Sequence, residues 1–451
     1  MLDFNTNSHL DASRWTYPYE ESLRIGAELK FPLTTCTGDP VSRRTVEMVW
    51  QHMLRCSWKP LIDKGTCALI GATQSQHEGR HTASCETGYC KIEFALAPVA
   101  NLFDLEKSIA SVRDVMRSFS EKNDARFLAV GIHPAGEPGS RLMSANSRAS
   151  VWDRVLVSNK QVQPHNGHDV HLFTLNAGSH VHLNVPDSAR IAVLNVLNAF
   201  VPAQLALTAN STVWQGELDP RLNCVNEMLW GWWLDDPRRY GVPDRPFENY
   251  ESYVDYIADL PFLFAVRDEV PILINRKSSL RQFLKLPKCE GTKLDGSTVT
   301  IRPNSDDLYT HYRCCWHCNR LTRYHTVENR TNDQQLPGEL VVIAALTLGL
   351  ISALPEALED ISNFNWSDLP ELRVEACLKD SERNNSRYLL RAMANRMVAL
   401  ADLGLRRRNR GEEVFLAPLH ERLRDYTCPS HNVAHQFAAG GLSALVDFLT
   451  I

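Results

Sequence analysis

Four short segments place ionic side chains where they could carry out chemistry together. In residues 25–31, Glu28 and Lys30 share one face, because side chains alternate along a strand, while Leu29 and its apolar neighbours point to the other face. The same alternation gathers polar residues in three further segments: His180, His182 and Asn184; Glu328 and Arg330; Lys91 and Glu93. Gly88 permits a turn that could bring Glu86 beside Glu93. Each segment is expected to be a strand with an apolar and an ionic face.

The recurring residue types on these ionic faces are Glu, His and Asn, which offer oxygen and nitrogen ligands to cations. Several carboxylates facing one concavity repel each other unless cations lie among them. This arrangement could hold Mg²⁺ ions against the phosphates of a nucleotide, since Mg²⁺ takes a few protein oxygens and completes its octahedron with phosphate and water. Antiparallel strands whose polar residues face only water remain the alternative for each single segment.

Other sequence signatures for phosphate or acyl chemistry are missing. The sequence has no G-x-x-x-x-G-K-[ST] loop, no convincing G-x-G-x-x-G after a strand, no G-x-S-x-G and no H-E-x-x-H. A bound nucleotide would therefore be held through metal ions and basic side chains.

A cluster of thiols suggests a second metal. The 12 cysteines are unevenly spaced and indicate reduced thiols. Cys315 and Cys318 have the C-x-x-C spacing of half a zinc site. The hypothetical structural Zn²⁺ site comprises Cys314, Cys315, His317 and Cys318, with His311, His325 or Cys289 as further possible ligands. Ordinary buried cysteines are the alternative.

The composition argues against two classes of function. The 48 basic and 53 acidic side chains leave a formal charge of −5, so nothing indicates binding to nucleic acid. The longest apolar stretch, Leu340 to Leu354, is shorter than the roughly 20 residues that cross a bilayer, and it predicts a buried helix. The N-terminal residues show no secretory signal, so we expect a cytoplasmic protein that does not bind membranes.

The elements that must position these residues are mixed. Residues 41–56, 102–121 and 187–207 have helical periodicity, and they interrupt the alternating segments. After Pro337 the pattern is helical, notably in residues 386–408 and 428–449. We expect an α+β protein with a catalytic antiparallel-sheet region, residues 1–336, and a helical region packed on it, residues 337–451.

In this order, the motifs resemble those of the glutamate–cysteine ligase family. The likeness comprises Gly26-x-Glu28-x-Lys30, Glu86 with Glu93-Phe94, His182-Leu-Asn184, Ala209-Asn210-Ser211 with Trp230, residues 253–261, Glu328-x-Arg330-x-x-Asp333, and Gly404 to Pro418. The resemblance implies a curved antiparallel sheet similar to that of glutamine synthetase, with covering helices. It also implies an ATP-dependent enzyme that joins the side-chain carboxylate of glutamate to an amine through an acyl phosphate.

The resemblance assigns a role to each candidate residue. The Mg²⁺ ligands would be Glu28, Glu86, Glu93, His182 and Glu328. Glu328 and Arg330 would be catalytic, with Arg330 stabilising the transferred phosphoryl group. The nucleotide contacts would be Lys30, Lys91, Asn184, Asn210 and Arg330. A surface position for Lys91 is equally compatible with the sequence. The expected partners are ATP, glutamate or a similar carboxylate and an amine, and a homodimer stays open.

The chain departs from the family pattern in three places. Lys30 stands where a second glutamate is usual, so one Mg²⁺ ligand is missing and an ammonium takes its place. Asn226 replaces an arginine suited to a substrate carboxylate, so the amine could differ from cysteine. Residues 314–318 resemble an insertion. Two alternatives follow: a phosphotransferase on the same sheet, and a non-catalytic ligand-binding relative whose metal site is disabled by Lys30.

Overall fold

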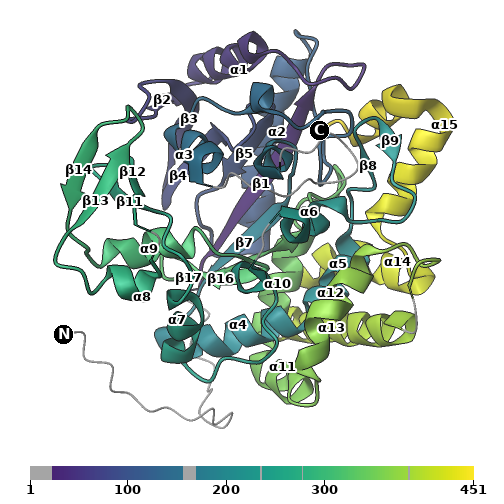
Figure 1. Cartoon of the computed structure of the whole chain (residues 1–451). Helices are drawn as coiled ribbons and strands as arrows, with labels where there is room; N and C mark the ends of the chain where they lie inside the picture. The colour runs from purple at the N-terminus through teal and green to yellow at the C-terminus, as the bar shows by residue number, and fades with distance from the viewer. Residues whose placement is uncertain (1–22, 156–168, 234–235, 277, 384–385) are drawn as a thin grey trace.

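The computed structural model describes residues 23–155, 169–233, 236–276, 278–383 and 386–451, and it confirms the predicted α+β class (Figure 1). Its centre is a nine-stranded sheet in which every described pairing is antiparallel. The strand order is β16 (Asn319–Leu321), β17 (Thr326–Asn332), β7 (Ser179–Asn184), β1 (Ile25–Thr34), β5 (Lys91–Ala95), β4 (Gly79–Cys85), β3 (Leu69–Gln76) and β2 (Lys59–Ile62), with β6 (Arg126–Phe127) paired to β1.

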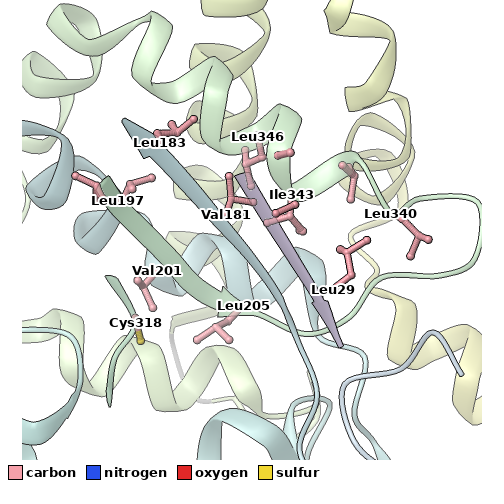
Figure 2. Packing of buried hydrophobic residues seen from close by; sticks show 14 of the residues in the cluster. Leu29, Val181, Leu183, Leu197, Val201, Leu205, Cys318, Leu340, Ile343 and Leu346 are labelled. Carbon is pink, nitrogen blue, oxygen red and sulfur yellow. The ribbon is translucent and has the colours of Figure 1, made fainter. Parts of the chain in front are cut away.

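Alternation along the central strands separates the two faces of the sheet, as the sequence predicts. Leu29 on β1 and Val181 and Leu183 on β7 are buried against helices. Figure 2 shows Val181 beside Ile343 and Leu346, which come from α10 (Val342–Ser352). The opposite face is left for the ionic residues.

Three apolar helices cover the buried face, namely α4 (Arg190–Ala199), α5 (Val201–Thr208) and α10. The sequence predicts one helix over residues 187–207, but the chain breaks at Phe200, where the backbone leaves helical geometry ahead of Pro202. Nearly every residue of α10 is buried, so this helix lies inside the protein rather than on its surface. Within the described chain, no helix by itself has the length and apolarity to cross a bilayer.

Helix α10 packs closely on α13 (Ser386–Arg408) because both helices carry a glycine at the contact. A Cβ atom on Gly404 would lie 2.0 Å from the carbonyl oxygen of Gly349. Any side chain there would force the helices apart, so the pair of glycines fixes how the helical region sits on the sheet.

A smaller sheet beside the main one has its own apolar core. Its strands are β11 (Phe264–Arg267), β12 (Val270–Ile274), β13 (Cys289–Lys293) and β14 (Thr298–Ile301), accompanied by α8 (Leu280–Phe283) and α9 (Asp306–Tyr312). Two short pairs are β8 (Val213–Trp214) with β9 (Glu217–Leu218), and β10 (Tyr240–Gly241) with β15 (Trp316–His317). Helix α9 ends next to the main sheet, which matters for the site.

The remaining helices surround this frame (Figure 1). They are α1 (Arg43–Arg55), α2 (Leu102–Ser120), α3 (Ser147–Val155), α6 (Val225–Trp233), α7 (Tyr250–Ala258), α11 (Leu354–Ile361), α12 (Leu369–Cys377), α14 (Ala417–Asp425) and α15 (Pro429–Leu449). The named elements in the described chain after Pro337 are all helices, yet Leu346 and Leu29 belong to one continuous core. The division at residue 336 therefore stays a prediction.

Candidate active site

The ionic face of the sheet forms the floor of a cavity of about 550 Å³. Its floor comes from β1, β5, β7 and β17, and its walls from α3, α6 and the segment after α9. Part of the wall is aromatic: Trp230 stacks on Trp316 with ring centres 5.7 Å apart, and Trp152 meets Trp316 edge-on at 5.4 Å. The cavity thus offers charged groups on one side and flat apolar surfaces on the other.

Three side chains on neighbouring strands converge at one end of this floor. The Nε2 atom of His182 lies 3.2 Å from Glu28 Oε1 and 3.7 Å from Glu328 Oε1. Register explains the meeting, since His182 pairs across strands with Glu328 on one side and with Gly26, two residues before Glu28, on the other. All three ligand atoms lie within 4.8 Å of one another. We call Glu28, His182 and Glu328 the ligand triad.

The charge of Glu328 is fixed by two arginines. Glu328 is almost fully buried, and its two oxygens lie 2.7 Å from Arg320 Nε and 2.5 Å from Arg330 Nη1. Burial alone would raise the pKa of Glu328, but the charges of Arg320 and Arg330 outweigh it and hold this pKa far below the ordinary value. Glu328 is therefore a carboxylate at any pH at which the protein works.

The pKa values of the two histidines of β7 shift in opposite directions. Burial, followed by the charges of Lys30 and Arg330, lowers the pKa of His180 to about 3, so this ring is neutral although its Nδ1 lies 3.1 Å from Glu28. For His182, burial is outweighed by Glu328 and Glu28, and its pKa is raised. A neutral imidazole beside the ligand triad can orient Glu28 without adding charge.

Lys30 lies at the other end of the floor, surrounded by carboxylates. Its Nζ is 3.0 Å from Glu93, 3.7 Å from Glu86 and 3.9 Å from Glu28. Burial alone would lower the pKa of Lys30, but the charges of Glu86, Glu93 and Glu28 outweigh it, and the pKa is raised. Lys30 therefore stays positively charged and occupies the place between Glu28, Glu86 and Glu93 where a cation is needed.

The carboxylates around Lys30 do not all carry a full charge. Burial, together with the charges of Glu28 and Glu86, raises the pKa of Glu93 to about 8, even though Lys30 opposes the shift. Burial of Glu86 is outweighed by Lys30, Lys91 and Arg148, and its pKa is lowered.

Glu86 reaches this position through a tight backbone approach, because a Cβ atom on Gly88 would lie 2.0 Å from the carbonyl oxygen of Thr174. The predicted turn therefore needs glycine.

Comparison with known proteins identifies the family. The model for glutamate–cysteine ligase family 2 matches residues 24–447. The chain belongs to this family. This membership confirms the resemblance carried by the strand motifs, and it supports the predicted class of enzyme, an ATP-dependent ligase.

The relatives within the glutamate–cysteine ligase family are distant. The chloroplastic glutamate–cysteine ligase of Brassica juncea is 24% identical over 432 residues, which cover 93% of this chain and 78% of that protein. A relative in Gloeobacter violaceus is 27% identical over 181 residues, and the match spans only 41% of its length. The crystal structure of glutamate–cysteine ligase from Francisella tularensis in complex with AMP matches with a TM-score of 0.49 and 10% identity, covering 95% of this chain and 87% of that one.

The residues of this family member fit one divalent cation at the ligand triad. The triad offers two carboxylate oxygens and one imidazole nitrogen on the wall of an open cavity, which leaves the remaining positions to water and phosphate. The two other predicted Mg²⁺ ligands, Glu86 and Glu93, lie around Lys30 instead. The structure thus separates the five predicted ligands into a triad that suits a metal and a pair that already faces a cation.

Three predicted nucleotide contacts lie outside the residues that line the cavity. Lys91 is buried, and its ammonium donates to Asn176 Oδ1 at 2.7 Å and to the carbonyl oxygen of Phe173. Asn210 is buried and donates to the carbonyl oxygens of Ala129 and Gln334. Asn184 accepts from the backbone of Arg24 at the strand end. These contacts support structural roles, and they also exclude the surface position for Lys91.

The predicted zinc ligands do not converge. Among the described residues, the ligand triad forms a group with metal-ligand spacing, whereas no three of Cys314, Cys315, His317 and Cys318 do. His317 instead pairs with the carbonyl oxygen of Arg238, and Cys318 donates to Glu227. Of the further candidates, His311 pairs with the carbonyl oxygen of Ile257. The structure gives no support to the zinc prediction, because the thiols of this segment are packed into the apolar core.

Sequence reasoning missed Arg320 and His180 as site residues. Arg320 lies in the short strand β16, which pairs directly with Glu328. The alternation Asn319-Arg320-Leu321 offered a signal, but three residues are too few to identify a strand from sequence. His180 was placed on the ionic face with His182, and its position opposite Glu28 depends on a register that only the folded sheet defines.

Proposed function

We propose that this chain is an ATP-dependent ligase that joins the side-chain carboxylate of glutamate to an amine through an acyl-phosphate intermediate. The observation that carries this proposal is the ligand triad, with Arg320 and Arg330 bound to one of its carboxylates, on the wall of one cavity. Family membership supplies the reaction class.

The difficulty of the first step is charge, since a carboxylate must attack a polyanion. An oxygen of the substrate carboxylate forms a bond to the γ-phosphorus while the bond to the β-phosphate oxygen breaks, and ADP leaves. A Mg²⁺ ion at the triad would neutralise phosphate charge when bound. Arg330 can stabilise the transferred phosphoryl oxygens. Lys30 adds a positive charge that, unlike a bound metal ion, cannot leave the site.

In the second step the nitrogen of the amine attacks the acyl carbon. Inorganic phosphate leaves with the electron pair of the C–O bond, and the nitrogen loses a proton to give the amide. Asn226 lines the cavity, but its side-chain nitrogen already donates to Ala177 and Asp333 at 2.8 and 2.9 Å. The amide of Asn226 offers no positive charge to a carboxylate, which supports an amine other than cysteine.

The test is incubation of the full chain with ATP, Mg²⁺, glutamate and a panel of amines and amino acids, with ADP release and product mass measured together. We expect ADP in amounts equal to a γ-glutamyl amide of one panel member. Glu28→Gln serves as the matched inactive variant. A stable phosphorylated product formed without any amine would identify a phosphotransferase instead, and a lack of ADP with every combination would contradict a ligase.

A further inference from the structure

Arg313 is a cationic side chain of the cavity that has no partner among the described residues. It follows the last residue of α9 and lines the cavity together with Arg148 and Arg323. No carboxylate in the described chain lies within ion-pair distance of its guanidinium, and no oxygen accepts a hydrogen bond from its side chain. The side chain of Arg313 is exposed to the open cavity, and the charge of Arg148, followed by the charges of Arg323 and Arg320, lowers its pKa to about 10.

The turn that carries Arg313 is held in place by two other arginines. Arg320 Nη1 donates to the carbonyl oxygens of Tyr312 and Cys315, both at 3.3 Å, and Arg239 Nη1 donates to that of Cys314 at 3.0 Å. The carbonyl oxygens on both sides of Arg313 are therefore occupied. The backbone that carries Arg313 is therefore positioned before any ligand arrives, which lowers the entropy cost of binding.

The positive charge at this wall exceeds the negative charge beside it. Arg148 has Glu86 at 3.6 Å, and Arg320 has Glu328 at 2.7 Å. Within the described ranges, the guanidinium of Arg323 interacts with Tyr324 alone, through a hydrogen bond at 2.7 Å and the face of the ring. Like charges that gather on a cavity wall cost free energy unless an anion lies among them.

We propose that Arg313, together with Arg148 and Arg323, binds an oxyanion of a substrate, either a carboxylate or a phosphate group. A guanidinium presents a planar pair of N–H donors that matches both groups. The identity of the substrate rests on the proposed function, whereas the site itself does not.

Binding of small anions to the full chain tests this site without any turnover. The probes are tripolyphosphate and glutarate, measured by titration calorimetry in EDTA and checked by the fluorescence of Trp152, Trp230 and Trp316. The variants are Arg313→Ala and Arg313→Lys, and the matched control is Arg44→Ala on the exposed face of α1, away from the cavity.

We expect Arg313→Ala to weaken the binding of one probe at least tenfold, Arg313→Lys to weaken it less, and Arg44→Ala to leave it within twofold. Loss of tripolyphosphate binding alone identifies a phosphate subsite, and loss of glutarate binding alone identifies a carboxylate subsite. The proposal would be overturned if both Arg313 variants bound both probes with the affinity of the wild type. It would also be overturned if the wild type bound neither probe. Since no reaction is measured, failure to find an amide product does not affect this result.

Discussion

The Lys30 ammonium lies 3.0 Å from the carboxylate of Glu93, its cross-strand partner on β5. Glu86 and Glu28 lie within 4 Å of the same ammonium, so one covalently attached cation faces three acidic side chains. This part of the site therefore keeps its positive charge whatever the concentration of metal ions in solution.

Replacing Lys30 with methionine should destabilise the fold, because it removes a cation that lies within 4 Å of three partly buried glutamates. We expect the free energy of unfolding to fall by about 3 kcal/mol in EDTA, measured by chemical denaturation at neutral pH. The control is Lys64→Met, which removes an exposed ion pair with Glu269 and should cost less than about 1 kcal/mol. Equal effects in the two variants would show that the three carboxylates do not depend on Lys30.

Replacing Lys30 with glutamate should change how activity depends on Mg²⁺. The new carboxyl group joins Glu28, Glu86 and Glu93, and this concentration of acidic groups requires an additional cation. We expect half-maximal activity at a higher Mg²⁺ concentration than in the wild type, from titration at saturating ATP. An unchanged Mg²⁺ titration would place Lys30 outside the reaction.

The two carboxylates of the ligand triad should respond differently to amidation. Glu28→Gln and Glu328→Gln each remove a metal ligand, and each should weaken Mn²⁺ binding by at least roughly 10- to 100-fold. Only Glu328→Gln leaves two buried guanidiniums without their carboxylate, so only this variant should also show a large fall in melting temperature. Normal Mn²⁺ binding in Glu28→Gln would exclude the triad as a metal site.

The raised pKa of Glu93 predicts a pH dependence of stability. In the folded chain this carboxyl keeps its proton up to about pH 8, whereas the unfolded chain loses it near the ordinary value of 4.5. Its contribution to stability is therefore complete below about pH 4.5 and is lost as the pH rises toward 8. Glu93→Gln cannot lose a proton, so denaturation in EDTA should show its largest gain over the wild type at pH 8 to 9. A constant difference between the two proteins from pH 5 to 9 would contradict the raised pKa.

The cysteine segment should contain no zinc. Elemental analysis of the purified protein should give far less than one zinc per chain, and chelation should not change the melting temperature. Cys315→Ala should lower stability by about 1 to 2 kcal/mol through loss of a buried side chain, with or without the chelator. Stoichiometric zinc would show that the thiols rearrange from the geometry seen here.

The sequence predicted the strands of the site well, because alternation is a local property. Glu28, His182 and Glu328 were assigned to one ionic face before any register was known, and the register then brought them together. Asn210 shows where the sequence is ambiguous, and its predicted nucleotide contact stays a prediction. In sequence, an asparagine that donates to two backbone carbonyl oxygens looks the same as one that faces a ligand. Only the folded structure shows that Asn210 is buried together with the two carbonyl groups it binds.

Arg313 marks the limit of such reasoning. Its side chain belongs to no periodic element, and its place on the cavity wall depends on a turn that is held by Arg320, which is near in sequence, and by Arg239, which is far from it in sequence. The contact with Arg239 joins distant segments, and neither composition nor spacing predicts it.

The double pairing of Glu328 has a consequence for the order in which ligands arrive. Its two oxygens are already engaged by Arg320 and Arg330, so a metal ion entering alone must compete with both guanidiniums for one carboxylate. A metal ion that enters bound to a polyphosphate brings acceptors to which the displaced guanidiniums can turn. Under the proposed function, the resting site would therefore bind a metal–nucleotide complex more readily than the bare ion, and the first productive encounter would be with both components together.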